Sequence, residues 1–197
     1  VKVFDGENIS FLRFERGKSV EPVKVIGKTD KKGTEVTFFA DPAIFEDTNY
    51  DYDTLLKRLR EQAFLNKGIN VEFTDLRGEE PISNTLHYEG GIKSFVEYRN
   101  TEGKKEALHE DIIYFEAQKG DTYAEVAMQY TSAFSEDILS FANNINTTEG
   151  GMHETGFKAS LTRTINEYAR KRKMIKEDET LSGDDVREGL TVIISVK

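Results

Sequence analysis

The sequence predicts an α+β fold in two pieces, with a boundary between Arg77 and Tyr88. Short runs rich in β-branched and aromatic residues, separated by turn residues, are typical of strands and hairpins. Two stretches, residues 53–66 and 154–174, carry apolar residues at helical spacing. The pattern also changes along the chain. Strands, a helix and a hairpin precede the boundary, whereas a helix, three strands, a long helix and a final strand follow it.

The first piece begins with two predicted strands joined by Asp5-Gly6, a dipeptide that favours a hairpin turn. The helix over 53–66 places Leu55, Leu59 and Ala63 on one face. Proline cannot donate to a strand ladder, so the Asp-Pro pair at 41–42 ends the third strand. The predicted strands are 1–4, 9–14 and 34–39, with a short apolar run at 23–26 and a hairpin formed by 69–73 and 82–87.

The second piece opens after Gly90-Gly91 with a short helix that has Ile92, Phe95 and Val96 on one face. Ser182 followed three residues later by Asp185 predicts a capped helix near 184–188. The predicted strands are 112–116, 123–130, 138–144 and 190–196.

The long helix over 154–174 is the most informative feature. Phe157, Leu161, Ile165 and Tyr168 fall on one side and predict its buried stripe. Residues 158–176 carry seven basic side chains and one acid, a local net charge of +6. The basic side of this helix is either a surface that meets a phosphate backbone or a solvated face, and local pattern leaves both open.

Composition narrows the class of protein. The chain has 197 residues, 27 Lys and Arg, 36 Asp and Glu and no Cys. The formal charge of −9 argues against a wholly basic nucleic-acid-binding domain. This charge is the sum of +6 over residues 158–176 and −15 over the rest of the chain, so a local basic face remains possible. The absence of cysteine excludes disulfides, thiolate zinc sites and cysteine nucleophiles. No run is long and apolar enough to predict a membrane span, and we expect a cytoplasmic protein.

Other patterns carry little chemistry. The Asn8 and Asn146 tripeptides match the glycosylation acceptor pattern, which occurs often by chance. The three histidines lie far apart, without ligand spacing, so no metal site is expected. The acids at 184–185 fit a helix N-terminus better than a cation site. No phosphate-binding loop motif and no sequence-readable catalytic triad is present.

Several motifs, in order and along essentially the whole chain, resemble the ATPase subunits of bacterial type IIA DNA topoisomerases. They are Gly33-Thr34-x-Val36-x-Phe38, Arg58-Leu59-Arg60-Glu61-x-Ala63-Phe64-Leu65-Asn66-x-Gly68, His87-Tyr88-Glu89-Gly90-Gly91-Ile92, Phe141-x-Asn143-Asn144-Ile145, Glu149-Gly150-Gly151-x-His153-x-x-Gly156-Phe157 and Asp184-Asp185-x-Arg187-Glu188-Gly189-Leu190. The family has a gyrase branch and a topoisomerase IV branch. The motifs favour the gyrase branch without excluding the other.

The resemblance implies two domains. Residues 1–80 correspond to the C-terminal part of a GHKL ATPase domain, a two-layer α/β sandwich. Residues 81–197 correspond to a transducer domain with the ribosomal-protein-S5-domain-2-like fold, lacking its C-terminal end. In the family, the transducer relays the nucleotide state to the DNA-cleavage core and lines the cavity through which DNA passes.

The resemblance also implies site residues and partners. Gly33, Thr34 and Val36 match positions at the nucleotide pocket, and Lys158 matches a basic position that faces the DNA cavity. Helical geometry then adds Arg163, Arg170 and Lys173 to the expected DNA-facing set. The implied cofactors are ATP and Mg²⁺. The implied partners are DNA, the DNA-cleavage subunit (gyrase A in the gyrase branch) and a second copy of the same subunit.

The family's general base, its Mg²⁺-binding asparagine, its glycine-rich lid and its transducer lysine are expected outside this chain. We therefore expect a fragment with no catalytic residue, no bound cofactor and no ATP hydrolysis of its own. The alternative from another class is a non-enzymatic nucleic-acid-binding module that uses the basic helix over 154–176.

Overall fold

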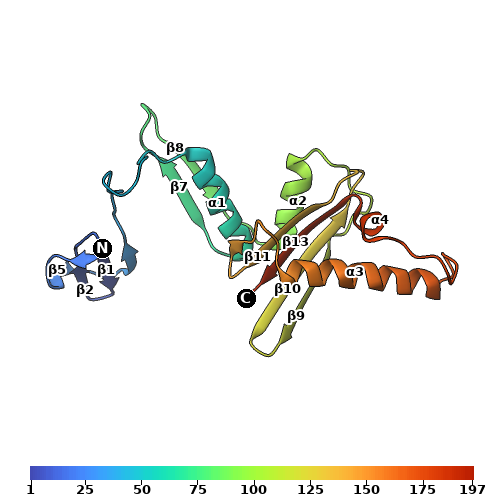
Figure 1. Cartoon of the computed structure of the whole chain (residues 1–197). Coiled ribbons are helices and arrows are strands. Elements are labelled where there is room, and N and C mark those ends of the chain that lie inside the picture. Colours follow the sequence, from blue (N-terminus) through green and yellow to red (C-terminus); the bar gives the residue numbers. More distant parts are fainter. The chain divides into compact units, whose positions relative to one another are not determined.

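The computed structural model describes all of residues 1–197, which pack as two units, Val1–Tyr50 and Asp51–Lys197 (Figure 1). The α+β class predicted from the sequence is confirmed, since both strands and helices form as separate elements.

The first unit is built on an antiparallel sheet with strand order β5-β2-β1-β6. The predicted turn at its start forms, because the Asp5 carboxylate accepts hydrogen bonds from the backbone N–H groups of Glu7 and Asn8, and Gly6 has φ of +96°. The strands are β1 (Lys2–Asp5), β2 (Asn8–Phe11), β5 (Lys24–Lys28) and β6 (Lys32–Glu35), with a separate small hairpin of β3 (Phe14–Glu15) and β4 (Lys18–Ser19).

Two strand predictions in this unit were too long. The strand expected over 9–14 ends at Phe11, and the strand expected over 34–39 ends at Glu35. The ladder between β1 and β6 reaches only the Lys2–Glu35 pair, so nothing pairs with the chain beyond it. None of the side chains of residues 1–50 is buried, and Phe38 and Phe39 are largely exposed.

The second unit holds a five-stranded sheet with order β12-β11-β13-β10-β9, in which only the β11–β13 pair is parallel. Its helices are α1 (Tyr52–Leu65), α2 (Ile92–Glu102), α3 (Met152–Lys171) and α4 (Gly183–Arg187). Its sheet strands are β9 (Ile113–Lys119), β10 (Thr122–Tyr130), β11 (Asp137–Ala142), β12 (Ile145–Asn146) and β13 (Leu190–Val196), beside a hairpin of β7 (Val71–Asp75) and β8 (Ile82–Leu86).

Strand β13 lies at the centre of the sheet and separates two cores. Successive side chains of a strand point to opposite faces. Ile193 therefore joins Phe64, Phe95 and their neighbours from α1 and α2 on one face. On the other face, Leu190, Val192 and Ile194 pack with residues of β10 and with the first half of α3. Figure 1 shows α2 and α3 on opposite faces of this sheet.

Helix α1 belongs to the core of the second unit. The ring of Phe64 stacks on Tyr88, with centroids 3.7 Å apart, and on Phe95 at 4.6 Å. The packing of the chain therefore divides after Tyr50, and α1 lies with the elements that follow the predicted boundary. The assignment of residues 1–80 and 81–197 to two family domains stays a prediction.

Candidate nucleic-acid interface

Helix α3 carries the basic residues singled out in the sequence. It starts at Met152, after Gly150 with φ of +78°, and ends at Lys171, three residues before the predicted end. Phe157 and Leu161 pack against the sheet as predicted. The placement of Tyr168 in the buried stripe was wrong. Its side chain is 54% exposed, and its ring lies 5.4 Å from the Arg172 guanidinium carbon.

The second half of α3 packs against the chain segment at 179–182 instead of the sheet. Asn166, which is 4% exposed, holds the backbone of Leu181 at two points. Its Oδ1 accepts from the Leu181 N–H over 2.8 Å, and its Nδ2 donates to the Leu181 carbonyl over 3.0 Å. We call these two hydrogen bonds the clamp between Asn166 and Leu181. The apolar periodicity of the helix does not predict it, because Asn166 is polar and Leu181 lies 15 residues further along the chain.

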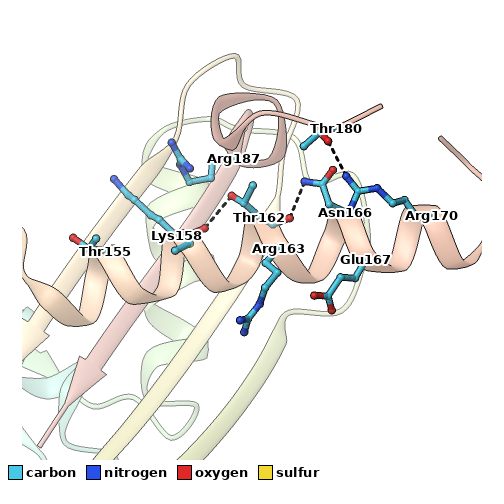
Figure 2. A pocket seen from close by; sticks show the side chains of 10 residues that line it. Thr155, Lys158, Thr162, Arg163, Asn166, Glu167, Arg170, Thr180 and Arg187 are labelled. Carbon is cyan, nitrogen blue, oxygen red and sulfur yellow. Dashed lines mark hydrogen bonds between the residues drawn. The ribbon is translucent and has the colours of Figure 1, made fainter. Parts of the chain in front are cut away.

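Arg170 also belongs to this attachment. Its Nη2 donates to the Glu179 carbonyl over 3.1 Å. The same nitrogen donates to Thr180 Oγ1 over 2.7 Å (Figure 2). Arg170 Nε is buried without a hydrogen-bond partner. The structure therefore uses this predicted DNA-facing cation to fasten the 179–182 segment.

A groove of about 650 Å³ runs beside α3 and gathers most of the predicted DNA-facing residues. It brings Lys158, Arg163 and Arg170 together with Arg187, whereas Lys173 is not among its lining residues. Figure 2 shows Lys158 and Arg187 on one side of α3, with Arg163 pointing to the other. Sequence reasoning did not single out Arg187 as a cation of this surface, since it lies on α4, far along the chain.

Lys158 is held by two carboxylates. Its Nζ lies 3.0 Å from Glu136 Oε1 and 3.0 Å from Glu154 Oε1. Partial burial works against the charged form of Lys158, but hydrogen bonds to both acids outweigh it and raise the pKa of the ammonium. Hydrogen bonds from Lys158 and Arg187 lower the pKa of Glu136, and hydrogen bonds from Ser140 and Lys158 lower the pKa of Glu154, in both cases against the opposing effect of burial.

Arg163 and Lys173 differ from these residues. Both side chains are exposed, and neither makes an ion pair or a side-chain hydrogen bond within the chain. Lys173 follows the helix in a left-handed conformation with φ of +57°. Of the four predicted DNA-facing residues, these two have their charges free to meet an external anion.

The predicted nucleotide-pocket residues lie in the first unit. Gly33 and Thr34 are in β6, and Gly33 has φ of +151°, a conformation that favours glycine. Val36 follows the strand, is 62% exposed and lines a hollow of about 1310 Å³ that Phe38 and Phe39 also line. Gly33 and Thr34 are not among the lining residues of this hollow.

The structure contains neither a cluster of metal-ligating side chains nor a helix that could span a membrane. Nowhere do three or more His, Cys, Asp or Glu side chains gather in a way that could hold a metal ion. Each helix is either too short or too polar to cross a bilayer.

Comparison with known proteins gives the family. The model of the DNA gyrase B family matches residues 91–197, which is more than half of the chain. The chain belongs to the DNA gyrase B family. The resemblance found in the sequence motifs is thereby confirmed.

Curated members of the gyrase B family match the whole chain. The DNA gyrase B protein of Halalkalibacterium halodurans is 52% identical over 100% of this chain, which covers 31% of that protein. The DNA gyrase B protein of Enterococcus faecalis is 49% identical, again over 100% of this chain and 31% of that protein. The chain thus spans about a third of the length of these relatives.

Solved structures agree with the gyrase B assignment. The 43K ATPase domain of Thermus thermophilus gyrase B, determined with an aminocoumarin, has a TM-score of 0.82 and 35% identity, covering 100% of this chain and 53% of that one. The ATP-binding domain of topoisomerase IV from Francisella tularensis has a TM-score of 0.76 at 22% identity, covering 100% of this chain and 52% of that one, and shows the fold alone.

Proposed function

We propose that this chain is part of the ATP-binding subunit of DNA gyrase, an ATP-dependent type II topoisomerase. The observation that carries this proposal is identity near 50% to gyrase B proteins over the full chain. Both curated relatives described above are gyrase B proteins, and this favours the gyrase branch.

Within that subunit, residues 1–80 would complete one wall of the nucleotide site, and residues 81–197 would act as the transducer. Gly33, Thr34 and Val36 are the proposed contacts on the nucleotide side. ATP and Mg²⁺ are the proposed cofactors, and DNA, gyrase A and a second copy of the subunit are the proposed partners in the cytoplasm.

Helix α3 is the proposed DNA-facing element. The exposed and unpaired charges of Arg163 and Lys173 support this role, because unpaired Lys and Arg can neutralise phosphates and release counterions. Lys158 and Arg170 add positive charge to the same helix, although Lys158 is paired with two carboxylates and Arg170 is hydrogen-bonded to the 179–182 segment.

Supercoiling of relaxed circular DNA by the complete protein, assembled with its cleavage subunit, tests the assignment. ATP-dependent negative supercoiling is expected. Relaxation alone would point to the topoisomerase IV branch, and DNA binding without any ATP-dependent change of topology would favour a non-enzymatic binding module.

The DNA-facing role of α3 has its own test. Reversing both charges in Arg163→Glu/Lys173→Glu is expected to reduce the stimulation of ATP hydrolysis by DNA while leaving the DNA-independent rate nearly unchanged. Lys119→Glu, at the exposed end of β9, reverses one charge instead of two at a position away from α3 and serves as the control. Stimulation that survives the double reversal would show that the basic side of α3 is only solvated.

A further inference from the structure

Glu136 bridges two cations that come from different helices. Its Oε1 lies 3.0 Å from the Nζ of Lys158 on α3, and its Oε2 lies 2.5 Å from the Nε of Arg187 at the end of α4. Both oxygens of one carboxylate are thus used by two separate positive side chains. Such charge-assisted contacts are the ones by which Lys and Arg also bind phosphate oxygens.

The two cations are outnumbered by acids. Lys158 also pairs with Glu154 over 3.0 Å, and the Nη2 of Arg187 pairs with Asp184 over 2.9 Å. Three carboxylates therefore surround two positive charges, and this corner of the groove carries a net charge of −1. An external anion gains little at this corner while Glu136 stays in place.

The cations are held more firmly than the acid. Helix α4 is anchored by its buried Val186, whose carbonyl accepts from Tyr130 Oη over 2.8 Å, and by the clamp between Asn166 and Leu181. Glu136 lies outside any helix or strand, in the β10–β11 connection, where Phe134 is 91% exposed. The Glu136 side chain is 36% exposed, against 28% for Lys158 and 15% for Arg187, so of these three Glu136 has the most room to turn toward solvent by side-chain rotation.

We propose that Lys158 and Arg187 form a subsite for one backbone phosphate of DNA, and that Glu136 occupies this subsite when DNA is absent. The proposal rests on the proposed DNA-facing role of α3 and adds Arg187 and Glu136 to it. Glu136 acts as an internal competitor of the phosphate and lowers the affinity of the groove for DNA.

Equilibrium binding of a linear duplex DNA to the complete protein at low salt tests this competition. Glu136→Gln is expected to tighten binding about fivefold, because one opposing charge beside the phosphate is removed. Glu167→Gln is the matched control, since Glu167 lines the same groove but forms no ion pair, and its gain is expected to be about twofold or less. Glu136→Asp keeps the charge but shortens the side chain, so it should tighten binding about twofold through the loss of one contact.

A double-mutant cycle assigns the gain to the two cations. In a Lys158→Gln/Arg187→Gln background, removing the Glu136 charge should no longer improve binding more than Glu167→Gln does. The proposed competition would be overturned if Glu136→Gln and Glu167→Gln raised the affinity for DNA equally. It would also be overturned if Glu136→Gln still raised the affinity in the Lys158→Gln/Arg187→Gln background. If Arg163→Glu/Lys173→Glu leaves wild-type affinity unchanged, then it is the DNA-facing role of α3 itself that fails.

Discussion

The side-chain amide of Asn144 donates a hydrogen bond to Oδ1 of Asn66 over 3.0 Å and so joins the tight turn between β11 and β12 to the end of α1. A second hydrogen bond joins the same two segments, because Gln62 Nε2 donates to the Asn144 carbonyl over 2.9 Å. Within the end of α1, Asn66 Nδ2 donates to the Gln62 carbonyl over 2.9 Å. Asn143 and Asn144 have φ of +49° and +65°, which fits a two-residue hairpin turn.

Two substitutions at Asn144 should separate the contribution of its side-chain hydrogen bond to stability from that of its left-handed backbone conformation. Asn144→Gly is expected to lower the free energy of unfolding by about 1 kcal/mol, since one hydrogen bond is lost and the left-handed backbone is retained. Asn144→Ala should lower it by about 2 kcal/mol, because alanine adds strain at positive φ. Urea unfolding followed by far-UV circular dichroism measures both, and equal losses would show that the turn is not strained.

Asp137 should contribute to stability through its ion pairs. Its carboxylate accepts from Lys105 Nζ over 2.6 Å and from Arg99 Nη2 over 3.0 Å, with a side chain only 18% exposed. Asp137→Asn is expected to cost about 2 kcal/mol at pH 7, because Lys105 loses its ion-pair partner and Arg99 keeps only the more distant Glu102 at 3.4 Å. Asp184→Asn, whose side chain is 97% exposed, should cost less than about 0.5 kcal/mol and serves as the control.

The effect of Asp137 should depend on pH. Burial tends to raise the pKa of this carboxyl, but Lys105 and Arg99 outweigh it and hold the pKa below its ordinary value of 3.8. A lowered folded-state pKa adds stability above the unfolded-state pKa, and this stability is lost as pH falls through the folded-state pKa. The difference between wild type and Asp137→Asn should therefore be full at pH 7 and shrink at pH values below 3.8. A difference that stays constant down to pH 2 would contradict this account.

Gly189 should tolerate no side chain. It has φ of +72°, and a Cβ atom there would lie 2.3 Å from the Thr131 carbonyl oxygen and 2.9 Å from that of Ala133. Gly189→Ala is expected to cost about 3 kcal/mol or more, from backbone strain combined with a clash against fixed backbone. Gly68→Ala has a similar φ of +85° with nothing within 4 Å, so it should cost only about 1 kcal/mol. Thermal unfolding of the two variants should separate strain from clash, and similar costs would rule the clash out.

Phe64 should anchor α1 to the second unit. The side chain is 1% exposed and stacks on two other rings, so Phe64→Ala is expected to cost about 3–5 kcal/mol. Phe134→Ala removes the same atoms from a side chain that is 91% exposed and should change stability by less than about 0.5 kcal/mol. If α1 were held only by its connections in the chain, the two variants would behave alike in urea unfolding.

Features that depend on residues close together along the chain can be predicted from the amino-acid sequence. Ser182 and Asp185 form the capping box that their spacing predicts. Ile92, Phe95 and Val96 are buried on one face of α2 as their periodicity indicates, and residues 190–196 form the strand β13. The family could also be recognised, because its motifs are short runs whose order along the chain is visible without a structure.

Which basic residues of α3 are free to bind an external anion depends on contacts between segments that lie far apart along the chain. Lys158 and Arg187 meet at Glu136, which is 22 and 51 residues away from them along the chain. Arg170 and Asn166 hold the 179–182 segment, which covers the half of α3 where Tyr168 had been predicted to face the core. Periodicity shows that a helix has an apolar side and a charged side, but ion pairs between distant segments depend on how the chain crosses from β11 to β13. That crossing leaves Arg163 and Lys173 unpaired, whereas Lys158 and Arg170 already have partners.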